Sequence, residues 1–431
     1  MMFSVRTKEP RSGSSRAGTL AALDVGTDKV TCLIARLGEP GGPRAKPEII
    51  GVGHQVSEGI KAGTIVDMER AGEAIRAAVE AAERQANIRV QRVIANVLCG
   101  DPDSRTIHVE LDLHGNAVSE QDIRRIVSHG RQSFDLKDRE VLHVLPVGYA
   151  LDGCRGIKDP REMFGERLGV DLNFVSAGLG PIRNLMICVE RCHIDLAAMV
   201  YGAYASGIAC LTDDERNLGV TCIDMGAGTT SLAVFAEGEL QFAGVVPIGG
   251  QLITHDLARG LSTPIEHAER LKTMHGSVLR GARDDQDMLS IVQVGEEHET
   301  DALSVPKSVL TKIIRARVEE TFEHVRERID KAGFGQVAGN RVVLTGGASQ
   351  LNGIRELAGD ILGKQVRLGA PHGCVSGTDP VVSPAFSACV GLLGYAAKAV
   401  SHTGLGEFEL MAAAQSGRRF GWFGKIFGGS F

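Results

Sequence analysis

The sequence predicts an α/β protein of two related lobes, and three observations lead to this prediction. The length of 431 residues is more than one ordinary hydrophobic core organises, so several compact units are expected. One pattern occurs twice, 200 positions apart: an apolar strand, a turn that begins Asp-x-Gly, and a second strand. Helical periodicity lies between and after the two copies, as in Met68 to Gln85 and Lys307 to Lys331.

The composition narrows the class of protein. Hydrophobic residues make up 43% and charged residues 23%, which is ordinary for a soluble globular chain. A net charge of -6 gives no reason to expect nucleic-acid binding, and no run of about 18 apolar residues predicts a membrane span. Nine cysteines, mostly in apolar runs, indicate reduced thiols in the cytoplasm. Cys188, Cys192 and His193 could ligate a metal, but no second ligand pair has a zinc-like spacing, so core packing is favoured.

The first half begins with a polar, basic arm and continues as strand, turn and strand from Leu20 to Ala35, with Asp24 at the turn. Alternating apolar residues from Arg105 to Leu113 predict a strand with one buried face, and a capping pattern at Ser119 starts a helix. We read this stretch as a small α+β insertion in the first lobe.

The second half repeats strand, turn and strand from Val220 to Phe235, with Asp224 at the turn. Lys307 to Lys331 predicts a long amphipathic helix, and the strand Arg341 to Leu344 leads into a Gly-Gly turn with a helix starting near Leu351. After Ser401 the composition becomes linker-like. We therefore expect the following divisions: arm 1–18, first-lobe core 19–100, insertion 101–177, first-lobe core 178–215, second-lobe core 216–250, second-lobe outer subdomain 251–331, second-lobe core 332–375, return to the first lobe 376–402, linker 403–416 and terminal helix 417–431.

The paired turns predict a nucleotide site. Small residues let backbone N–H groups approach phosphate oxygens, and the threonine hydroxyls and Lys29 can add hydrogen bonds and charge. Asp24 and Asp224 supply one carboxylate from each lobe, which suits hydrated Mg²⁺. A single such turn is usually plain structure, so the prediction depends on the pair together with the Gly-Gly turn. The candidate nucleotide-binding residues are Gly26, Thr27, Asp28, Lys29, Gly226, Ala227, Gly228, Thr229, Thr230, Gly346, Gly347 and Ala348.

The C-terminal residues predict a membrane-binding helix. On a helical projection, aromatic and aliphatic side chains share one side, with basic residues and glycine opposite and no acidic residue nearby. The alternative is an apolar end that folds back onto the core. The candidate membrane-binding residues are Arg418, Arg419, Phe420, Trp422, Phe423, Lys425, Ile426 and Phe427.

These motifs together resemble a known superfamily. LDVGTDKVTCLIA, IDMGAGTTSLAVF and LTGGASQLNGI are similar to the phosphate-1, phosphate-2 and adenosine motifs of actin, sugar kinases and heat-shock chaperones. Within it, LTDDERNLGV and PAFSACVGLLGYA resemble the FtsA family of actin-like cell-division proteins. The resemblance implies two RNase H-like lobes with ATP and Mg²⁺ between them, and it places Glu269 and Lys272 near the ribose and base.

The same resemblance implies a function. It implies filaments at the cytoplasmic face of the bacterial inner membrane at the division site, the division protein FtsZ as a partner of residues 251–331, and other division proteins at the insertion. One departure concerns hydrolysis: Gly202 to Gly207 offers no carboxylate or amide to position water, so at most slow ATP hydrolysis is expected. Two alternatives remain at this stage, a small-substrate phosphotransferase and a PilM-like pilus adaptor.

Overall fold

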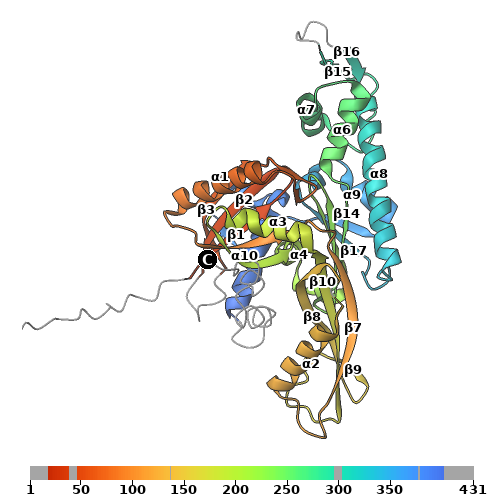
Figure 1. Cartoon of the computed structure of the whole chain (residues 1–431). Helices are drawn as coiled ribbons and strands as arrows, with labels where there is room; N and C mark the ends of the chain where they lie inside the picture. Colours follow the sequence, from red (N-terminus) through yellow and green to blue (C-terminus); the bar gives the residue numbers. More distant parts are fainter. Residues whose placement is uncertain (1–17, 38–45, 136, 296–302, 377–378, 402–431) are drawn as a thin grey trace, which may run out of the picture.

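A computed structural model describes residues 18–37, 46–135, 137–295, 303–376 and 379–401. Its centre is a pair of sheets, one in each lobe (Figure 1). The first sheet has the order β11 (Asp195–Tyr201), β6 (Arg92–Val97), β1 (Thr19–Val25), β2 (Lys29–Arg36), β3 (Glu48–Val56) and β19 (Val375–Ser376). The second has the order β14 (Glu239–Val246), β13 (Thr230–Ala236), β12 (Val220–Met225), β17 (Arg341–Thr345) and β18 (Gln365–Leu368).

The two sheets repeat one topology. In each, three consecutive strands form an antiparallel meander, β1–β2–β3 in the first lobe and β12–β13–β14 in the second. Two later strands then add in parallel beside the first strand of the meander, β6 and β11 in one lobe and β17 and β18 in the other. The duplicated α/β fold predicted from the two Asp-x-Gly turns is therefore confirmed.

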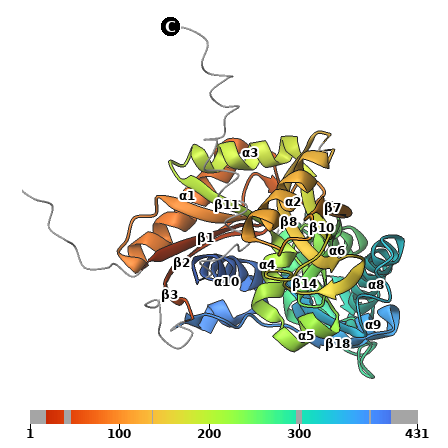
Figure 2. The ribbon, with the colours of Figure 1, turned by 90° about the horizontal axis from the view of Figure 1, so that it is seen from below.

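Helices cover both faces of the first sheet and fill the space between the lobes (Figure 2). The outer face carries α1 (Met68–Ala86) and α3 (Leu179–Glu190), and the hairpin of β4 (Ile60–Lys61) and β5 (Thr64–Ile65) lies beside them. The helix α4 (Gly202–Cys210) packs on β12 and β13, whereas α10 (Ser387–Ser401) packs on β1 and β2. These two helices also pack on each other, so they form the contact between the lobes.

The insertion is a separate layer with its own core. Its sheet has the order β7 (Asp103–Asp112), β10 (Arg167–Gly178), β8 (Arg139–Leu151) and β9 (Cys154–Ile157), and α2 (Glu120–Ser133) covers one face. As the alternating pattern predicts, Val109 and Leu113 are buried, and the predicted capping pattern at Ser119 forms a reciprocal capping box with Asp122. The small α+β insertion predicted for this segment is therefore confirmed.

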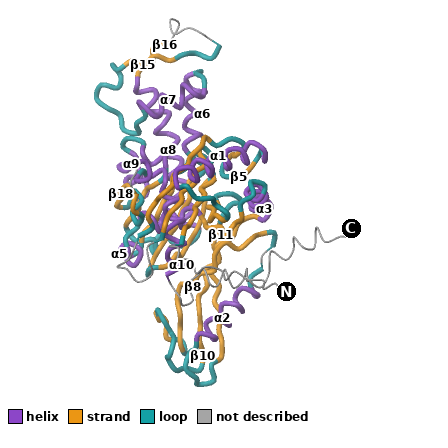
Figure 3. Tube along the Cα trace, turned by 90° about the vertical axis from the view of Figure 1, so that its left-hand side faces the viewer, coloured by secondary structure: helices purple, strands orange, loops and turns teal. Residues whose placement is uncertain are grey.

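The outer part of the second lobe is mainly helical. It contains α6 (Gly250–Leu261), α7 (Ile265–His275), the hairpin of β15 (Met288–Ile291) and β16 (Leu303–Pro306), and α8 (Lys307–Lys331). The bounds of α8 are those predicted, and Leu310, Ile314 and Val318 bury its apolar face. Figures 1 and 3 show this part at one end of the elongated molecule and the insertion at the other.

Of the remaining described elements, one precedes β12 and the others follow β17. They are α5 (Asp213–Leu218), η2 (Gly347–Gln350), α9 (Ile354–Leu362), η3 (Asp379–Val382) and η4 (Pro384–Phe386). The helix expected near Leu351 begins only at Ile354, because a 3-10 turn precedes it and Gly353 has a left-handed φ of 79°. The helix predicted to start near Leu351 therefore begins three residues later.

Two further expectations concern cysteines and membranes. Cys188 and Cys192 are buried, and the Cys192 thiol lies 3.4 Å from the Gly72 carbonyl oxygen of α1, so their contacts are those of core residues. None of the helices described combines the length and the apolar character needed to cross a bilayer. The predicted arm, linker and terminal helix lie outside the described residues, except for the first residue before β1, Gly18.

Candidate nucleotide-binding site

The site is built on two β-hairpins of the same geometry, β1–β2 and β12–β13. Each hairpin turns over four residues, and the first turn residue donates a backbone hydrogen bond to the carbonyl of the fourth. These bonds are Gly26 to Lys29, 3.1 Å, and Gly226 to Thr229, 2.9 Å. The equal registers make Lys29 and Thr229 equivalent positions of the two lobes. Their different side chains therefore occupy the same place in each hairpin.

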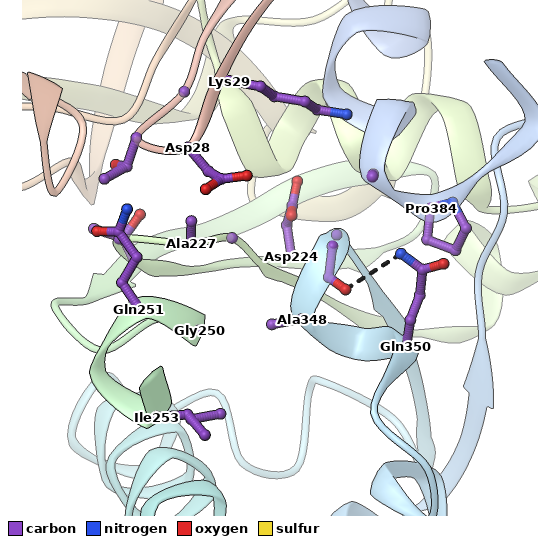
Figure 4. A pocket seen from close by; sticks show the side chains of 18 of the residues that line it. Asp28, Lys29, Asp224, Ala227, Gly250, Gln251, Ile253, Ala348, Gln350 and Pro384 are labelled. Atoms are coloured by element: carbon purple, nitrogen blue, oxygen red, sulfur yellow. Dashed lines mark hydrogen bonds between the residues drawn. The ribbon is translucent and has the colours of Figure 1, made fainter. Parts of the chain in front are cut away.

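The two hairpins face each other across a cavity of about 570 Å³ between the lobes (Figure 4). This volume is in the range of small-molecule and cofactor sites. The turns touch directly, because a side chain on Gly228 would overlap the Thr27 hydroxyl and come within 2.7 Å of the Ala62 Cα atom. Glycine at this position is thus required by the close approach of the other hairpin.

The cavity collects nearly all the residues predicted for the site. Its lining includes Asp24, Gly26, Thr27, Asp28, Lys29, Asp224, Gly226, Ala227, Gly228, Thr229, Glu269, Lys272, Gly346, Gly347 and Ala348. In Figure 4, Asp28 and Asp224 point toward one another from the two lobes.

Thr230 is the exception and corrects the prediction. It is the first residue of β13, it is fully buried, and it does not line the cavity. Its hydroxyl donates to the Ile248 carbonyl at 2.8 Å, so the side chain is turned into the sheet. The strand register, which alternates side chains between two faces, decides this direction.

The two carboxylates are held by different partners. The Asn96 amide of β6 donates to Asp24 at 2.5 Å, and the same side chain accepts from the Val25 N–H at 2.8 Å. The Ser206 hydroxyl of α4 donates to Asp224 at 2.5 Å. Burial raises the pKa of Asp24 to about 7; Lys29 opposes that shift and Asp224 adds to it. Burial also raises the pKa of Asp224, against the opposing effect of Ser206 and Lys29.

These two carboxylates fit a hydrated divalent cation. Asp24 is buried, Asp224 is partly exposed, and the Asp224 charge disfavours ionisation of Asp24, so a dication between them would relieve the cost of keeping both charged. Two carboxylates with the remaining positions left to water and phosphate match the coordination that Mg²⁺ prefers. The donor set therefore agrees with the cation predicted from the sequence.

Lys29 supplies positive charge beside the first hairpin. Its ammonium lies 3.5 Å from the centre of the Phe386 ring, a cation–π contact at the far side of the cavity. Burial lowers the pKa of Lys29, and the nearby Asp24 carboxylate opposes that shift. In Figure 4 the side chain extends toward the segment that carries Pro384. Lys29 therefore contributes a positive charge to the lining of the cavity.

The Gly-Gly turn forms a further wall of the cavity, beside the two hairpins. Gly346 has a φ of 85°, and any side chain there would overlap the Asp224 carboxylate. Its N–H donates to the Pro384 carbonyl at 3.2 Å, so this turn is fixed to the segment before α10. Within η2, the Gln350 amide donates to the Gly347 carbonyl, the dashed line in Figure 4. The turn therefore presents a flat backbone surface to the cavity.

The fourth side is formed by α6 and α7. Glu269 and Lys272 form an ion pair at 2.6 Å, and both also contact the Thr254 hydroxyl. Burial raises the pKa of Glu269, but hydrogen bonds from Lys272 and Thr254 outweigh it and the net direction is down. The pair thus lines the cavity as an ordered, charged unit.

Sequence reasoning missed several residues of the site. Asn96 is a polar residue inside the apolar run Val93 to Val97, and that isolation was a usable signal. Ser206 lies in the segment Gly202 to Gly207, which lacks a carboxylate or amide. Other lining residues give no signal in the sequence: Leu98, Ser231, Gly250, Gln251, Ile253, Thr273, Gly276, Gln350, Leu351, Pro384, Ala385 and Ala388.

Comparison with known proteins identifies the family. Residues 221–391 match the family model for cell division protein FtsA, and residues 100–176 match the model for the SHS2 domain inserted in FtsA. Cell division protein FtsA of Rhizobium meliloti (strain 1021) is 43% identical over 425 residues, which cover 96% of each chain. The chain belongs to the FtsA family of cell division proteins. FtsA of Agrobacterium fabrum is 46% identical over 389 residues, 89% of this chain and 88% of that one.

Solved structures confirm the actin-like fold of this FtsA-family chain. The PilM–PilN type IV pilus biogenesis complex matches with a TM-score of 0.60 at 15% identity, covering 87% of this chain and 97% of that one. MreB5 of Spiroplasma citri, solved bound to ADP, matches with a TM-score of 0.53 at 12% identity, covering 90% and 98%. At these identities the likeness concerns the fold alone. The SHS2 match coincides with the layer formed by β7 to β10, so the inserted subdomain is also that of the FtsA family.

Proposed function

We propose that this FtsA-family protein binds ATP with Mg²⁺ between its lobes and uses the nucleotide to control assembly. The observation that carries the proposal is the pair of equal hairpins whose carboxylates, Asp24 and Asp224, line one cavity between the lobes. A mononucleotide fits a cavity of this size, and its phosphates would lie against the two glycine-containing turns.

Each part of the cavity then has a defined role toward the nucleotide. Bound Mg²⁺ would neutralise phosphate charge, and Asp24 and Asp224 would hold it through water. Backbone groups of the two turns and the Lys29 ammonium would bind phosphate oxygens, while Glu269 and Lys272 would face the ribose and base. Because α4 carries Ser206 but no acid or amide in its first turns, hydrolysis is expected to be slow.

The assembled protein would act as a membrane anchor for the division ring. In this proposal, protomers form actin-like filaments, residues 417–431 bind the cytoplasmic face of the inner membrane, and the outer subdomain of α6 to α8 receives FtsZ. One short amphipathic helix binds a membrane weakly, and a filament multiplies that affinity through avidity. Family membership and the sequence of the C-terminal residues support this part of the proposal.

Calorimetric titration of ATP tests the nucleotide site. We expect Asp24→Asn and Asp224→Asn to weaken binding in the presence of Mg²⁺ by roughly 10- to 100-fold, because each removes a charge that the cation needs. Asp171→Asn, on the exposed face of the insertion, is the matched control and should bind as the wild type does. Equal binding by all four proteins would remove the carboxylates from the site.

Co-sedimentation with anionic liposomes tests the anchor. The intact protein with ATP and Mg²⁺ should pellet with the vesicles, and a chain that ends at Ser416 should remain soluble. Replacing Trp422 and Phe423 with Glu should have the same effect without shortening the chain, because charge opposes burial in the interface. Equal pelleting of all three proteins would exclude the C-terminal residues as the anchor.

A further inference from the structure

Ser206 occupies an unusual place in the contact between the lobes. It is fully buried on α4, and its hydroxyl donates to the Oδ2 atom of Asp224 at 2.5 Å. The other oxygen of that carboxylate, Oδ1, lies against Gly346 of the Gly-Gly turn. The carboxylate is therefore held between a helix on one side and a turn on the other.

The helix that carries Ser206 is itself fixed by α10. Its neighbour Ala205 lies at the closest approach of α4 and α10, where a side chain on Gly391 would overlap the Ala205 carbonyl group. Since α10 packs on the first sheet and α4 on the second, the position of Ser206 depends on how the two lobes meet. A shift of α4 against α10 would move the hydroxyl relative to Asp224.

We propose that Ser206 is a positioning residue that orients the Asp224 carboxylate for the cation and makes cation binding depend on the seating of α4 against α10. This inference rests on the proposed nucleotide and Mg²⁺ site. Mg²⁺ requires near-ideal octahedral geometry, so a carboxylate that can turn freely holds it less well than one fixed by a donor. Loss of such an outer partner typically weakens metal binding by roughly 10- to 100-fold.

The first lobe offers a matched control on the equivalent helix. Ser387 begins α10, is also buried, and shares a hydrogen bond of 2.7 Å with the Thr345 hydroxyl. It does not line the cavity, and the structure gives it no hydrogen bond to Asp24 or Asp224 among the described residues. Ser387→Ala therefore removes a buried hydroxyl of the same kind without touching a proposed cation ligand.

The experiment measures ATP affinity as a function of Mg²⁺ concentration in wild type, Ser206→Ala and Ser387→Ala. We expect Ser206→Ala to raise, by roughly 10-fold or more, the Mg²⁺ concentration at which half of the increase in ATP affinity is reached. ATP affinity in EDTA should be unchanged. Ser387→Ala should keep the wild-type Mg²⁺ dependence. Thermal unfolding without ligand measures how much each substitution destabilises the protein. A hydroxyl with a structural role alone would cost similar stability in both variants.

The outcomes separate this inference from the proposed function. A wild-type Mg²⁺ dependence in Ser206→Ala, with ATP still bound, would overturn the role of Ser206 and leave the nucleotide site standing. Absence of ATP binding by the wild type would overturn the site itself. If Ser206→Ala does not fold, Ser206→Cys keeps nearly the same volume with a weaker donor, and a smaller rise in the Mg²⁺ requirement is then the expected result.

Discussion

The hairpins β1–β2 and β12–β13 have the same backbone and each brings an Asp to the cavity, but the last three residues of their turns differ. At the fourth turn position the first hairpin carries Lys29, whereas the second carries Thr229. At the third position the first carries Asp28, and the second has Gly228. The turn of the first hairpin thus adds charged side chains to the cavity, whereas the turn of the second adds bare backbone and a hydroxyl.

The two hairpins also differ in the groups that hold their carboxylates. Asp24 is held by Asn96 from the adjacent parallel strand β6. The equivalent position on β17 is Thr345, whose hydroxyl is engaged with Gly369 and Ser387, so Asp224 is held from the helix α4 instead. The backbone is therefore repeated in the two lobes, but the groups that hold the carboxylates are not. Only the second carboxylate depends on a helix that lies between the lobes.

The largest effect is expected from a methyl group at the point where the hairpins touch. Gly228→Ala should weaken ATP binding by roughly 100-fold, because its Cβ atom would displace Thr27 and the backbone at Ala62 and separate the two turns. Gly148→Ala is the control, since its Cβ atom would meet open space. Calorimetric titration of both variants measures the difference. Near-wild-type affinity for Gly228→Ala would show that the hairpins need not touch when nucleotide is bound.

Substitution at the equivalent fourth positions sharpens the contrast in charge. Lys29→Met should weaken ATP binding by about 10- to 100-fold, since hydrogen bonds to charged groups contribute about 1.5 to 3 kcal/mol. Thr229→Val should cost about 3- to 10-fold, the range of a neutral hydrogen bond. Affinity for adenosine, which lacks phosphates, should be unchanged in Lys29→Met. Equal losses in the two variants would mean that the hairpins contribute alike despite their different charge.

These differences also show what the sequence could and could not predict. The repeated Asp-x-Gly turns were sufficient for the duplication, because local turn chemistry and strand patterning decide a hairpin. Asn96 and Ser206 were missed because they reach the carboxylates through parallel strand pairing and helix packing, across 72 and 18 positions of the chain. The prediction that Thr230 lies in the site was wrong because the direction of its side chain follows from the strand register and not from its distance to the turn.

The outer parallel strands of the two sheets provide another contrast, which depends on pH. The strand β11 continues directly into α4, whereas β18 is held by Arg367, which donates two hydrogen bonds to Glu215 of α5 at 2.7 and 2.6 Å. The Arg367 guanidinium lowers the pKa of Glu215 from 4.5 to about 2. A depressed carboxyl pKa stabilises the folded state above the unfolded pKa, and that contribution is lost as pH falls from about 4.5 toward about 2.

Glu215→Gln should therefore lower the free energy of unfolding by about 1 to 2 kcal/mol at pH 7, and the difference from wild type should shrink below pH 4.5. Urea unfolding of both proteins at several pH values measures this difference in the free energy of unfolding. Glu319→Gln, in the exposed pair with Arg315, is the control and should cost under about 0.5 kcal/mol. A difference that does not change with pH would assign the loss to packing instead of charge.

The smallest effect concerns how the two outer parts are attached to the sheets. The outer helices continue the second lobe directly, whereas the insertion joins the first lobe at Gly100 and Gly178, whose backbones are in hydrogen-bond contact at 2.6 Å. The insertion also docks on β14 of the second lobe, where the Asn173 amide donates to the Leu240 carbonyl at 2.7 Å. The insertion is thus fixed to both lobes, and the second attachment depends on a few polar contacts.

Asn173→Ala should loosen that docking by about 1 kcal/mol, because a buried carbonyl loses its donor. Hydrogen exchange should then rise by about 5-fold in β10 and β14 and stay unchanged in α7, which packs on α6. Asn116→Ala removes a similar bond within the insertion, from the Asn116 amide to the Leu113 carbonyl at 2.9 Å, and should leave β14 unaffected. Faster exchange in α7 as well would show that the two ends of the molecule are coupled, and that the insertion is not an independently attached part.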